Sequence, residues 1–388
     1  MNRVMIPESE YRERIQKAAT LAAERNLDVL LVNSTEADYA NVRYFSGFWP
    51  LFERAGVAIT PAGDAAIIVG PESTKFATDV SRISRVFTSL SYRESANPSY
   101  PELRPNDYRD VFRGLGVSGE AIRIGVCSLL DTTAVMMNDL RECYPKAEVV
   151  DAFDIMVKLR SIKSENELAC LREGFRITNL AMEEVRKALR PGVTELQMVG
   201  IAQRVIYENG AEYEGLPMYV FSEKSTRHAI SRPSYRVIEK DDIVQLNLSA
   251  KVDGYSPSIG YPVCVGALTP EKRRIVEFGL EAHNWTESKL SAGVPAASVA
   301  SDFYKMYQER GFEENFVYGP CHGIGMIEVE APWMESNSSY LLQPNMTFQI
   351  DTFVSGSTFG IRWEKGVVIR EGGVESLSAP IGEIYELG

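Results

Sequence analysis

No stretch of the 388-residue sequence approaches the roughly 18 consecutive apolar residues that a membrane-spanning helix needs. The first residues, MNRVMIPESEY, also lack the apolar core of a secretory signal peptide. The five cysteines are an odd number without any Cys-x-x-Cys spacing, which argues against a disulfide framework and against a structural zinc cluster. We therefore expect a cytoplasmic protein in a reducing compartment.

Basic residues are outnumbered, with 41 Lys and Arg against 53 Asp and Glu and a formal net charge of -12. This balance argues against a protein that binds nucleic acid or anionic membranes. We expect a small-molecule substrate, with no nucleic-acid partner and no membrane partner. The chain is 45% hydrophobic and 24% charged, as is typical of globular proteins, and its length suggests two or three domains.

Hydrophobic periodicity divides the chain into two parts. A helical pattern over residues 8–25 precedes short apolar runs at 29–32, 57–59, 65–69 and 122–126, which predict an α/β domain over residues 1–153. A capping box at Ser164 to Glu167 opens a long amphipathic helix that Arg190-Pro191-Gly192 ends. Further helices are predicted at 195–209, 270–290 and 297–310, and strands at 243–250, 261–266, 346–353 and 366–370. The second domain, 154–388, therefore mixes helices and strands, and the fold class is α+β.

The sequence contains only three histidines, so each is a candidate for proton transfer or metal binding. His283 lies among polar neighbours of a helical segment, which is typical of a surface or packing role. His322 stands in YGPCHGIG, where glycines leave its ring accessible. Asp351 ends the apolar run FQID, and Glu364 lies in the strand-like GIRWE. One histidine and two carboxylates suit a divalent cation or a metal-free proton-transfer site. The alternative is a purely structural role, in which Asp351 caps a loop and Glu364 forms an ion pair with Lys365 or an arginine.

Seven segments follow one another in a fixed order: KLRSIKS at 158–164, DIV at 242–244, Gly254-Tyr255, HGIG at 322–325, APW at 331–333, LQPNM at 342–346 and GIRWE at 360–364. Taken together they resemble the pita-bread superfamily of methionine aminopeptidases, aminopeptidase P, prolidase and creatinase. The resemblance covers about residues 154–378. The first 150 residues resemble, more loosely, the α/β domain of the aminopeptidase P and creatinase branch. The resemblance implies a creatinase-type N-terminal domain followed by a pita-bread catalytic domain.

The positions that bind metal in the superfamily are altered here. Its metallopeptidases hold two ions with Asp, Asp, His, Glu and Glu, and the resemblance places at these positions Asn247, Ser258, His322, Asp351 and Glu364. Asn247 and Ser258 remove two negative charges and the bridge between paired cations. The second histidine of the peptidase pattern is replaced by Val329. We therefore expect no dinuclear site and, as the first choice, no cofactor. The alternative is one Mn, Fe or Zn ion on His322, Asp351 and Glu364, helped by Asn247.

Creatinase, the metal-free member, also has asparagine at the first aspartate position and moves protons with an upstream histidine. His228 is the counterpart of that histidine after a local shift of the alignment. The glutamate with which creatinase polarises its substrate falls on Gly260, followed by Tyr261, so the chain is not expected to be creatinase itself. Phe52 and Arg54 resemble the Phe-x-Arg with which creatinase reaches a neighbouring subunit's site. They imply a homodimer with a shared site, whereas the alternative is an ordinary loop arginine.

Three functions remain as alternatives. The first is a creatinase-like hydrolase that cleaves an amide or amidino C–N bond of a small, carboxylate-bearing substrate. In it His228 or His322 moves the proton, and Asp351 and Glu364 orient that histidine or hold a cationic group. Its substrate-binding residues are Phe52, Arg54, Tyr261 and Arg362. The second function is an Xaa-Pro dipeptidase or aminopeptidase P-like enzyme with one divalent ion. The third is a lyase or a catalytically silent binding protein on the same fold.

Overall fold

The structure, a computed structural model, describes residues 3–387 and divides the chain into two compact units. The first unit is Ile6–Arg160, and the second contains the residues from Ser161 onward together with residues 3–5. The division thus falls after Arg160, whereas the sequence pattern places it before Asp154. Helix α6 (Phe153–Ser161) accounts for the difference, because it is bonded to the first unit. Tyr44 donates to the Leu159 carbonyl at 3.1 Å, and Arg160 donates to Asn41 at 2.6 Å.

The first unit is built on a six-stranded sheet with the strand order β4-β3-β2-β1-β5-β6. Its central strands are continuous apolar runs that are buried on both faces, as expected for a sheet covered by helices. The strands are β1 (Val29–Ser34), β2 (Ala55–Ile59), β3 (Ala65–Val69), β4 (Val86–Thr88), β5 (Arg123–Val126) and β6 (Glu148–Asp151). The helices are α1 (Glu8–Glu24), α2 (Ala40–Ser46), α3 (Thr74–Val80), the short η1 (Leu90–Tyr92), α4 (Tyr108–Gly114), α5 (Ala134–Cys143) and α6.

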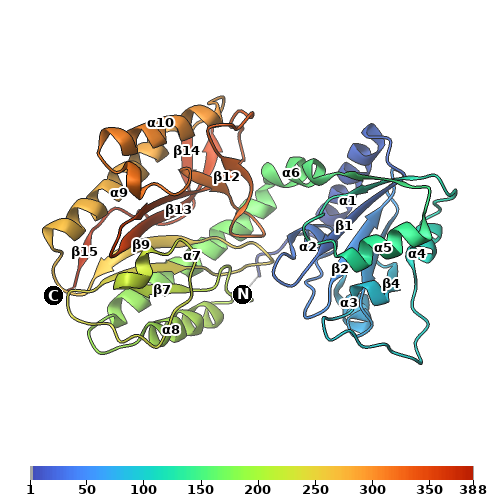
Figure 1. The fold of residues 1–388 in the computed structure, drawn as a ribbon, viewed down its shortest axis with the longest axis horizontal. Helices are drawn as coiled ribbons and strands as arrows, with labels where there is room; N and C mark the ends of the chain where they lie inside the picture. The colour runs from blue at the N-terminus through green and yellow to red at the C-terminus, as the bar shows by residue number, and fades with distance from the viewer. Residues whose placement is uncertain (1–2, 388) are drawn as a thin grey trace. The chain divides into compact units, whose positions relative to one another are not determined.

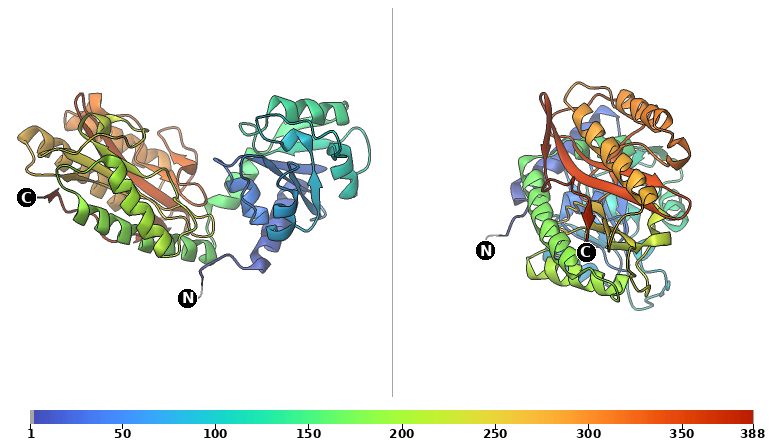
Figure 2. Two further views of the ribbon diagram at one scale, coloured as in Figure 1. Left: turned by 90° about the horizontal axis from the view of Figure 1, so that it is seen from below. Right: turned by 90° about the vertical axis from the view of Figure 1, so that its left-hand side faces the viewer.

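The second unit is built on a nine-stranded sheet with the main order β11-β10-β12-β13-β9-β8-β7. Helices α7 and α8 pack on the side of β8 and β9, and α9 packs on β12 and β13 with α10 beside it (Figures 1 and 2). The strands are β7 (Tyr219–Ser222), β8 (Ile243–Leu248), β9 (Ile259–Cys264), β10 (Cys321–Gly323), β11 (Glu330–Met334), β12 (Thr347–Ser355), β13 (Gly360–Arg370), β14 (Gly373–Ser376) and β15 (Tyr385–Glu386). The helices are α7 (Glu165–Ala188), α8 (Glu195–Glu208), η2 (Glu223–Arg227), α9 (Pro270–Lys289), α10 (Ala296–Glu309) and η3 (Glu313–Asn315). Among the residues described, the helices are too short or too polar to cross a membrane.

Strand register brings distant polar residues together on one face of this sheet. Glu364 of β13 lies opposite Asp351 of β12 on one side and Gly260 of β9 on the other. Gly260 in turn lies opposite Asn247 of β8. One row further, His322 of β10 lies opposite Gln349 of β12. Because side chains alternate between the two faces of a strand, the side chains of these rows share a face.

His283 holds the opposite face of β13. The sequence leaves a surface or packing role open for it, and the structure shows a completely buried ring in α9. Its Nδ1 lies 3.2 Å from the Trp363 carbonyl, which can only accept, so Nδ1 carries the hydrogen. Burial, the larger cause, and the nearby Lys365 charge together lower the pKa of His283 to about 3. The folded protein therefore keeps this ring neutral.

Acid should destabilise the fold through His283. Its folded pKa lies below the ordinary value of 6.5, so the unfolded chain binds the proton first and stability is lost as the pH falls from about 6.5 toward 3. The free energy of unfolding should drop by about 1.4 kcal/mol per pH unit in that window. Urea unfolding between about pH 7 and pH 5 measures this, with His283→Gln as the comparison because glutamine can donate to the Trp363 carbonyl without titrating. Equal pH slopes for the two proteins would contradict the assignment.

Candidate functional site

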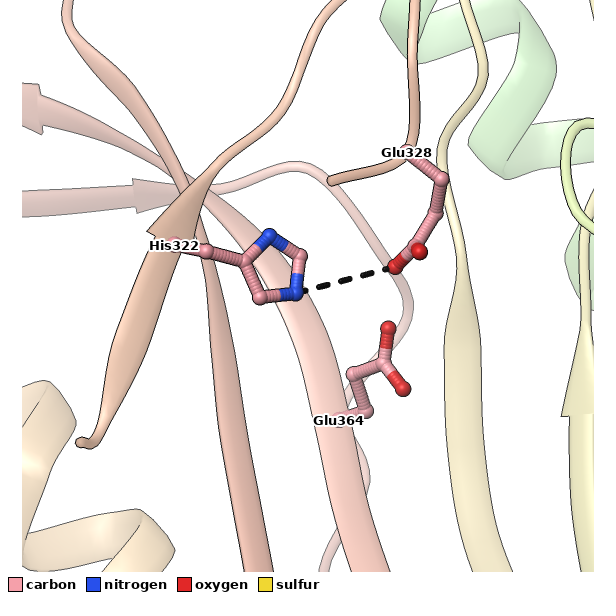
Figure 3. A group of neighbouring side chains, drawn as sticks. All are labelled: His322, Glu328 and Glu364. Carbon is pink, nitrogen blue, oxygen red and sulfur yellow. Dashed lines mark ion pairs between the residues drawn. The ribbon is translucent and has the colours of Figure 1, made fainter. Parts of the chain in front are cut away.

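His322, Glu328 and Glu364 form a compact cluster of possible metal ligands. Each offers one ligand atom, and these atoms all lie within 4.8 Å of one another (Figure 3). His322 comes from β10 and Glu364 from β13, whereas Glu328 comes from the segment between β10 and β11. The Nε2 atom of His322 is 3.8 Å from the Glu328 carboxylate. His322 and Glu364 are buried, and the Glu328 side chain is 13% exposed.

The backbone fixes which nitrogen of His322 faces the cluster. Nδ1 lies 3.0 Å from the Gly323 carbonyl, which can only accept, so this nitrogen carries the hydrogen of the neutral ring. Nε2 then has a free lone pair, and it points toward Glu328 (Figure 3). Nε2 of the neutral ring and the carboxylates of Glu328 and Glu364 are therefore all acceptors that face one another. A proton or a metal ion between them would satisfy their lone pairs.

Glu328 and Glu364 also require a positive charge between them. Burial raises the pKa of Glu328 well above its ordinary value, and the adjacent Glu364 carboxylate raises it further. The Oε1 atom of Glu364 is buried and has no hydrogen-bond partner among the residues described. Two neighbouring carboxylates in a buried place cannot both be charged unless something positive lies between them. The cluster is thus suited to one small cation.

Asp351 lies beside this cluster but is already neutralised. Its Oδ1 lies 3.0 Å from Nε of Arg362, and its Oδ2 accepts a hydrogen bond from the Tyr318 hydroxyl at 2.7 Å. Arg362 also donates to the Tyr318 hydroxyl at 2.6 Å and to the Ala229 carbonyl at 2.9 Å. Burial raises the pKa of Asp351, whereas the Arg362 guanidinium opposes that shift. The structure therefore engages Arg362 with Asp351, and its role as a substrate-binding residue stays a prediction.

Asn247 and Ser258 occupy the positions where the family pattern has aspartate. The completely buried Asn247 donates a hydrogen bond from its amide to the Glu364 carboxylate. Asn247 lies opposite Gly260 of the neighbouring strand, and a Cβ atom added to Gly260 would collide with the Asn247 amide. The Ser258 hydroxyl is buried without a partner among the described residues, while the Ser258 carbonyl accepts from Gln349. These residues supply no negative charge, so the donor set fits one cation and not two.

Three other predicted site residues do not belong to the cluster of His322, Glu328 and Glu364. Tyr261 is opposite Leu246 and therefore on the other face of the sheet from Gly260, where its ring contacts Tyr385 at 5.3 Å and burial raises its pKa to about 12. Phe52 and Arg54 belong to the first unit, where Phe52 is 75% exposed. The homodimer that these two residues imply stays a prediction.

His228 is also not a member of the cluster. It follows η2, it is exposed, and its Nδ1 lies 3.3 Å from the Ser231 hydroxyl. Its chain neighbour Ala229 reaches the site instead, through the carbonyl that Arg362 binds. The structure thus favours His322 over His228 as the histidine of the cluster.

Glu328 and Trp333 lie beside His322, although no sequence motif indicated a role for either side chain. The signal for Glu328 was an acid between two apolar residues in Ile327-Glu328-Val329, where no regular periodicity indicates a face. The next acid, Glu330, is buried as well but binds Lys163 at 2.8 Å. Trp333 lies opposite His322 in the sheet, with their ring centroids 5.4 Å apart, and it remains 37% exposed. Trp333 therefore gives the cluster an accessible aromatic wall.

Comparison with known proteins finds a matching family for each of the two units. Residues 169–371 match the metallopeptidase family M24, and residues 14–162 match the creatinase/prolidase N-terminal domain. The Bacillus subtilis protein YqhT, an uncharacterized peptidase, is 23% identical over 369 residues, which are 94% of this chain and 97% of that protein. An Xaa-Pro dipeptidase of Pyrococcus furiosus is also 23% identical over 369 residues, covering 95% and 98% of the two chains.

Solved structures show the same fold. An X-Pro aminopeptidase from Thermotoga maritima superposes with a TM-score of 0.81 at 22% identity, covering 96% of this chain and 99% of that one. The prolidase from Pyrococcus horikoshii gives a TM-score of 0.80 at 21% identity with the same coverage. The expected two-domain α+β pita-bread architecture is therefore confirmed.

The buried pair of Arg362 and Asp351 should be strongly coupled. Arg362→Met leaves the Asp351 charge without its counter-ion, and loss of one partner of a buried pair costs about 3–5 kcal/mol of folding stability. Adding Asp351→Asn to Arg362→Met removes that charge and should restore a large part of the loss. Urea unfolding of both single variants and the double variant measures the coupling. Additive losses in the double variant would show that the two residues act independently.

Proposed function

The chain belongs to metallopeptidase family M24, which places it among hydrolases of C–N bonds, and on this premise we propose a peptidase that cleaves small dipeptides with one divalent cation. The observation that carries the proposal is the cluster of His322, Glu328 and Glu364, whose ligand atoms lie within 4.8 Å of one another in a largely buried place. A histidine and two carboxylates suit a single Mn, Fe or Zn ion.

A bound divalent cation would supply Lewis-acid polarisation of the scissile carbonyl. His322, Glu328 and Glu364 would hold it, with the hydrogen bond from His322 to the Gly323 carbonyl keeping Nε2 free for it. Asn247 donates to Glu364 and thereby orients that carboxylate. Arg362 and Tyr318 hold Asp351 next to the cluster, with Oδ2 of Asp351 4.0 Å from Nε2 of His322. This ligand set differs from the one expected from the sequence, because Glu328 takes the place of Asp351 and Asn247 acts as a donor.

The proposed substrate is a dipeptide with an apolar second residue, such as proline. The support is twofold: relatives that share nearly the whole chain are named Xaa-Pro dipeptidases, and the half-exposed Trp333 ring stands beside His322. An aromatic face packs well against a proline ring. The tyrosine of the same wall, Tyr318, lies 6.3 Å from Trp333.

Two earlier alternatives have less support. A metal-free, creatinase-like enzyme shares the creatinase/prolidase N-terminal domain, but residues 169–371 match a metallopeptidase family, and the lone pair of His322 and the unpartnered Glu364 oxygen together favour a cation. Its proton-transfer candidate His228 is exposed and does not belong to the cluster. A silent binding protein would not need the three convergent ligand atoms, and a lyase is not supported by the match to a peptidase family.

Removal of one ligand should remove both metal and activity. Glu328→Gln keeps the shape of the side chain but loses its charge, so metal content should fall at least about tenfold from one ion per chain, and hydrolysis of Gly-Pro should fall about a hundredfold or more. Elemental mass spectrometry of protein loaded with Mn²⁺ and then desalted measures the first, and a dipeptide assay the second.

The matched control is Glu335→Gln, which makes the same change at an exposed glutamate shortly after β11. This variant should keep full metal content and full activity. Undiminished metal binding by Glu328→Gln, or Gly-Pro cleavage that survives exhaustive chelation, would refute the single-cation site.

The number of bound ions should depend on the two altered positions. Asn247→Asp combined with Ser258→Asp returns two carboxylates to the face that already holds Glu364, and the added negative charge should attract a second cation. Metal analysis and calorimetric titration with Mn²⁺ should then give two ions per chain instead of one. A stoichiometry that stays at one would show that residues other than Asn247 and Ser258 limit the site.

A further inference from the structure

Gln245 links two strands and the site through one buried amide. It lies on β8 two residues before Asn247 and therefore shares the site face. The backbone N–H of Arg362 donates to Gln245 Oε1 at 2.7 Å. The Gln245 amino group donates to the Arg362 carbonyl at 3.0 Å and to Asn247 Oδ1 at 2.9 Å. The amino group also donates to the carbonyl of the neighbouring Leu246 at 3.1 Å, so this amide is bonded to β13, to Asn247 and to its own strand.

Pro262 explains why the Gln245 side chain forms hydrogen bonds with the backbone of β13. Gln245 lies opposite Pro262 of β9, which has no N–H to give to a neighbouring strand. β9 pairs with β13 at Gly260 and Glu364, and continuing that antiparallel register by two residues sets Arg362 opposite Pro262. The Gln245 side chain therefore gives the Arg362 carbonyl the N–H that Pro262 lacks and also accepts from the Arg362 N–H, and these two bonds fix its position.

The same contacts fix the direction of each amide in turn. A backbone N–H can only donate, so the Gln245 oxygen must face Arg362 and its amino group must face Asn247. Asn247 consequently accepts with its oxygen, and its amino group is left to face the Glu364 carboxylate. Asparagine orientation is settled by such networks, and here the network starts from a backbone group of known polarity.

We propose that Gln245 is a positioning residue that locks Asn247 with its amino group toward Glu364, so that this corner of the site orients the carboxylate and repels a second cation. The proposal rests on the single-cation function proposed above. An amide that could rotate would present its oxygen to Glu364 part of the time and would act as a ligand instead of a donor. Because its amide is held in one orientation, Asn247, which stands at a family aspartate position, donates a hydrogen bond to Glu364 instead of binding a cation.

Selective ¹⁵N labelling of asparagine tests the lock without any need for turnover. The side-chain NH₂ signal of Asn247 is assigned by its disappearance in Asn247→Asp. In the wild-type protein this NH₂ should exchange its hydrogens slowly, because it is buried and bonded to a carboxylate. Gln245→Met has nearly the same length but forms no hydrogen bonds, and it should speed the exchange at least about tenfold. It should also lower kcat about tenfold while KM stays within about twofold, because Glu364 loses its orientation while the substrate contacts remain.

Two further variants keep the test decisive. Gln245→Glu retains an acceptor for the Arg362 N–H but has no N–H for Asn247, so it should reproduce the faster exchange even if Gln245→Met folds poorly. Leu246→Met, on the other face of the same strand, should leave the exchange unchanged. Slow Asn247 exchange in both Gln245 variants would overturn the lock. Absence of bound metal in the wild-type protein, with the exchange results as expected, would overturn the proposed single-cation function instead and leave the lock standing.

Discussion

The burial of charge determines what the sheet face with His322, Glu328 and Glu364 can bind. Asp351, Glu328 and Glu364 are acids in a poorly solvated place, where each unpaired charge costs several kcal/mol. The Arg362 guanidinium is used up by Asp351. Glu328 and Glu364 are left facing the lone pair of His322, so the remaining excess of negative charge and acceptor atoms is the physical reason why this site calls for a cation.

The neutral residues around the cluster reduce the same excess. Asn247 and Ser258 stand where the family pattern supplies two more carboxylates, and an amide and a hydroxyl need no counter-ion. Glu328, from the segment between β10 and β11, contributes one negative charge in their place. The net effect is a site whose acids suit one ion, and Gln245 ensures that the amide nearest to Glu364 contributes a donor.

The sequence predicted the long elements well and the short ones poorly. The capping box at Ser164 opens α7, and the predicted strand at 346–353 is β12, because long periodic patterns and caps are strong local signals. Helices such as α2 and α3, with seven residues each, were not predicted, since short helices depend on tertiary packing. His322, Asp351 and Glu364 were expected together because their motifs occur in family order, whereas Glu328 lies in an irregular segment. Tyr261 was a misplacement that strand alternation from Gly260 would have avoided.

The contact between Gly260 and Asn247 sets limits on how this protein can diverge. In the creatinase pattern a glutamate stands at the position of Gly260, but here the Asn247 amide fills the room that any side chain at 260 would need. Creatinase combines that glutamate with an asparagine at the position of Asn247, so the placing of the Asn247 side chain, and not its residue type, is what leaves no room here. Any side chain introduced at 260 would have to displace the Asn247 amide, so position 260 can change only if the hydrogen bond from Asn247 to Glu364 is given up.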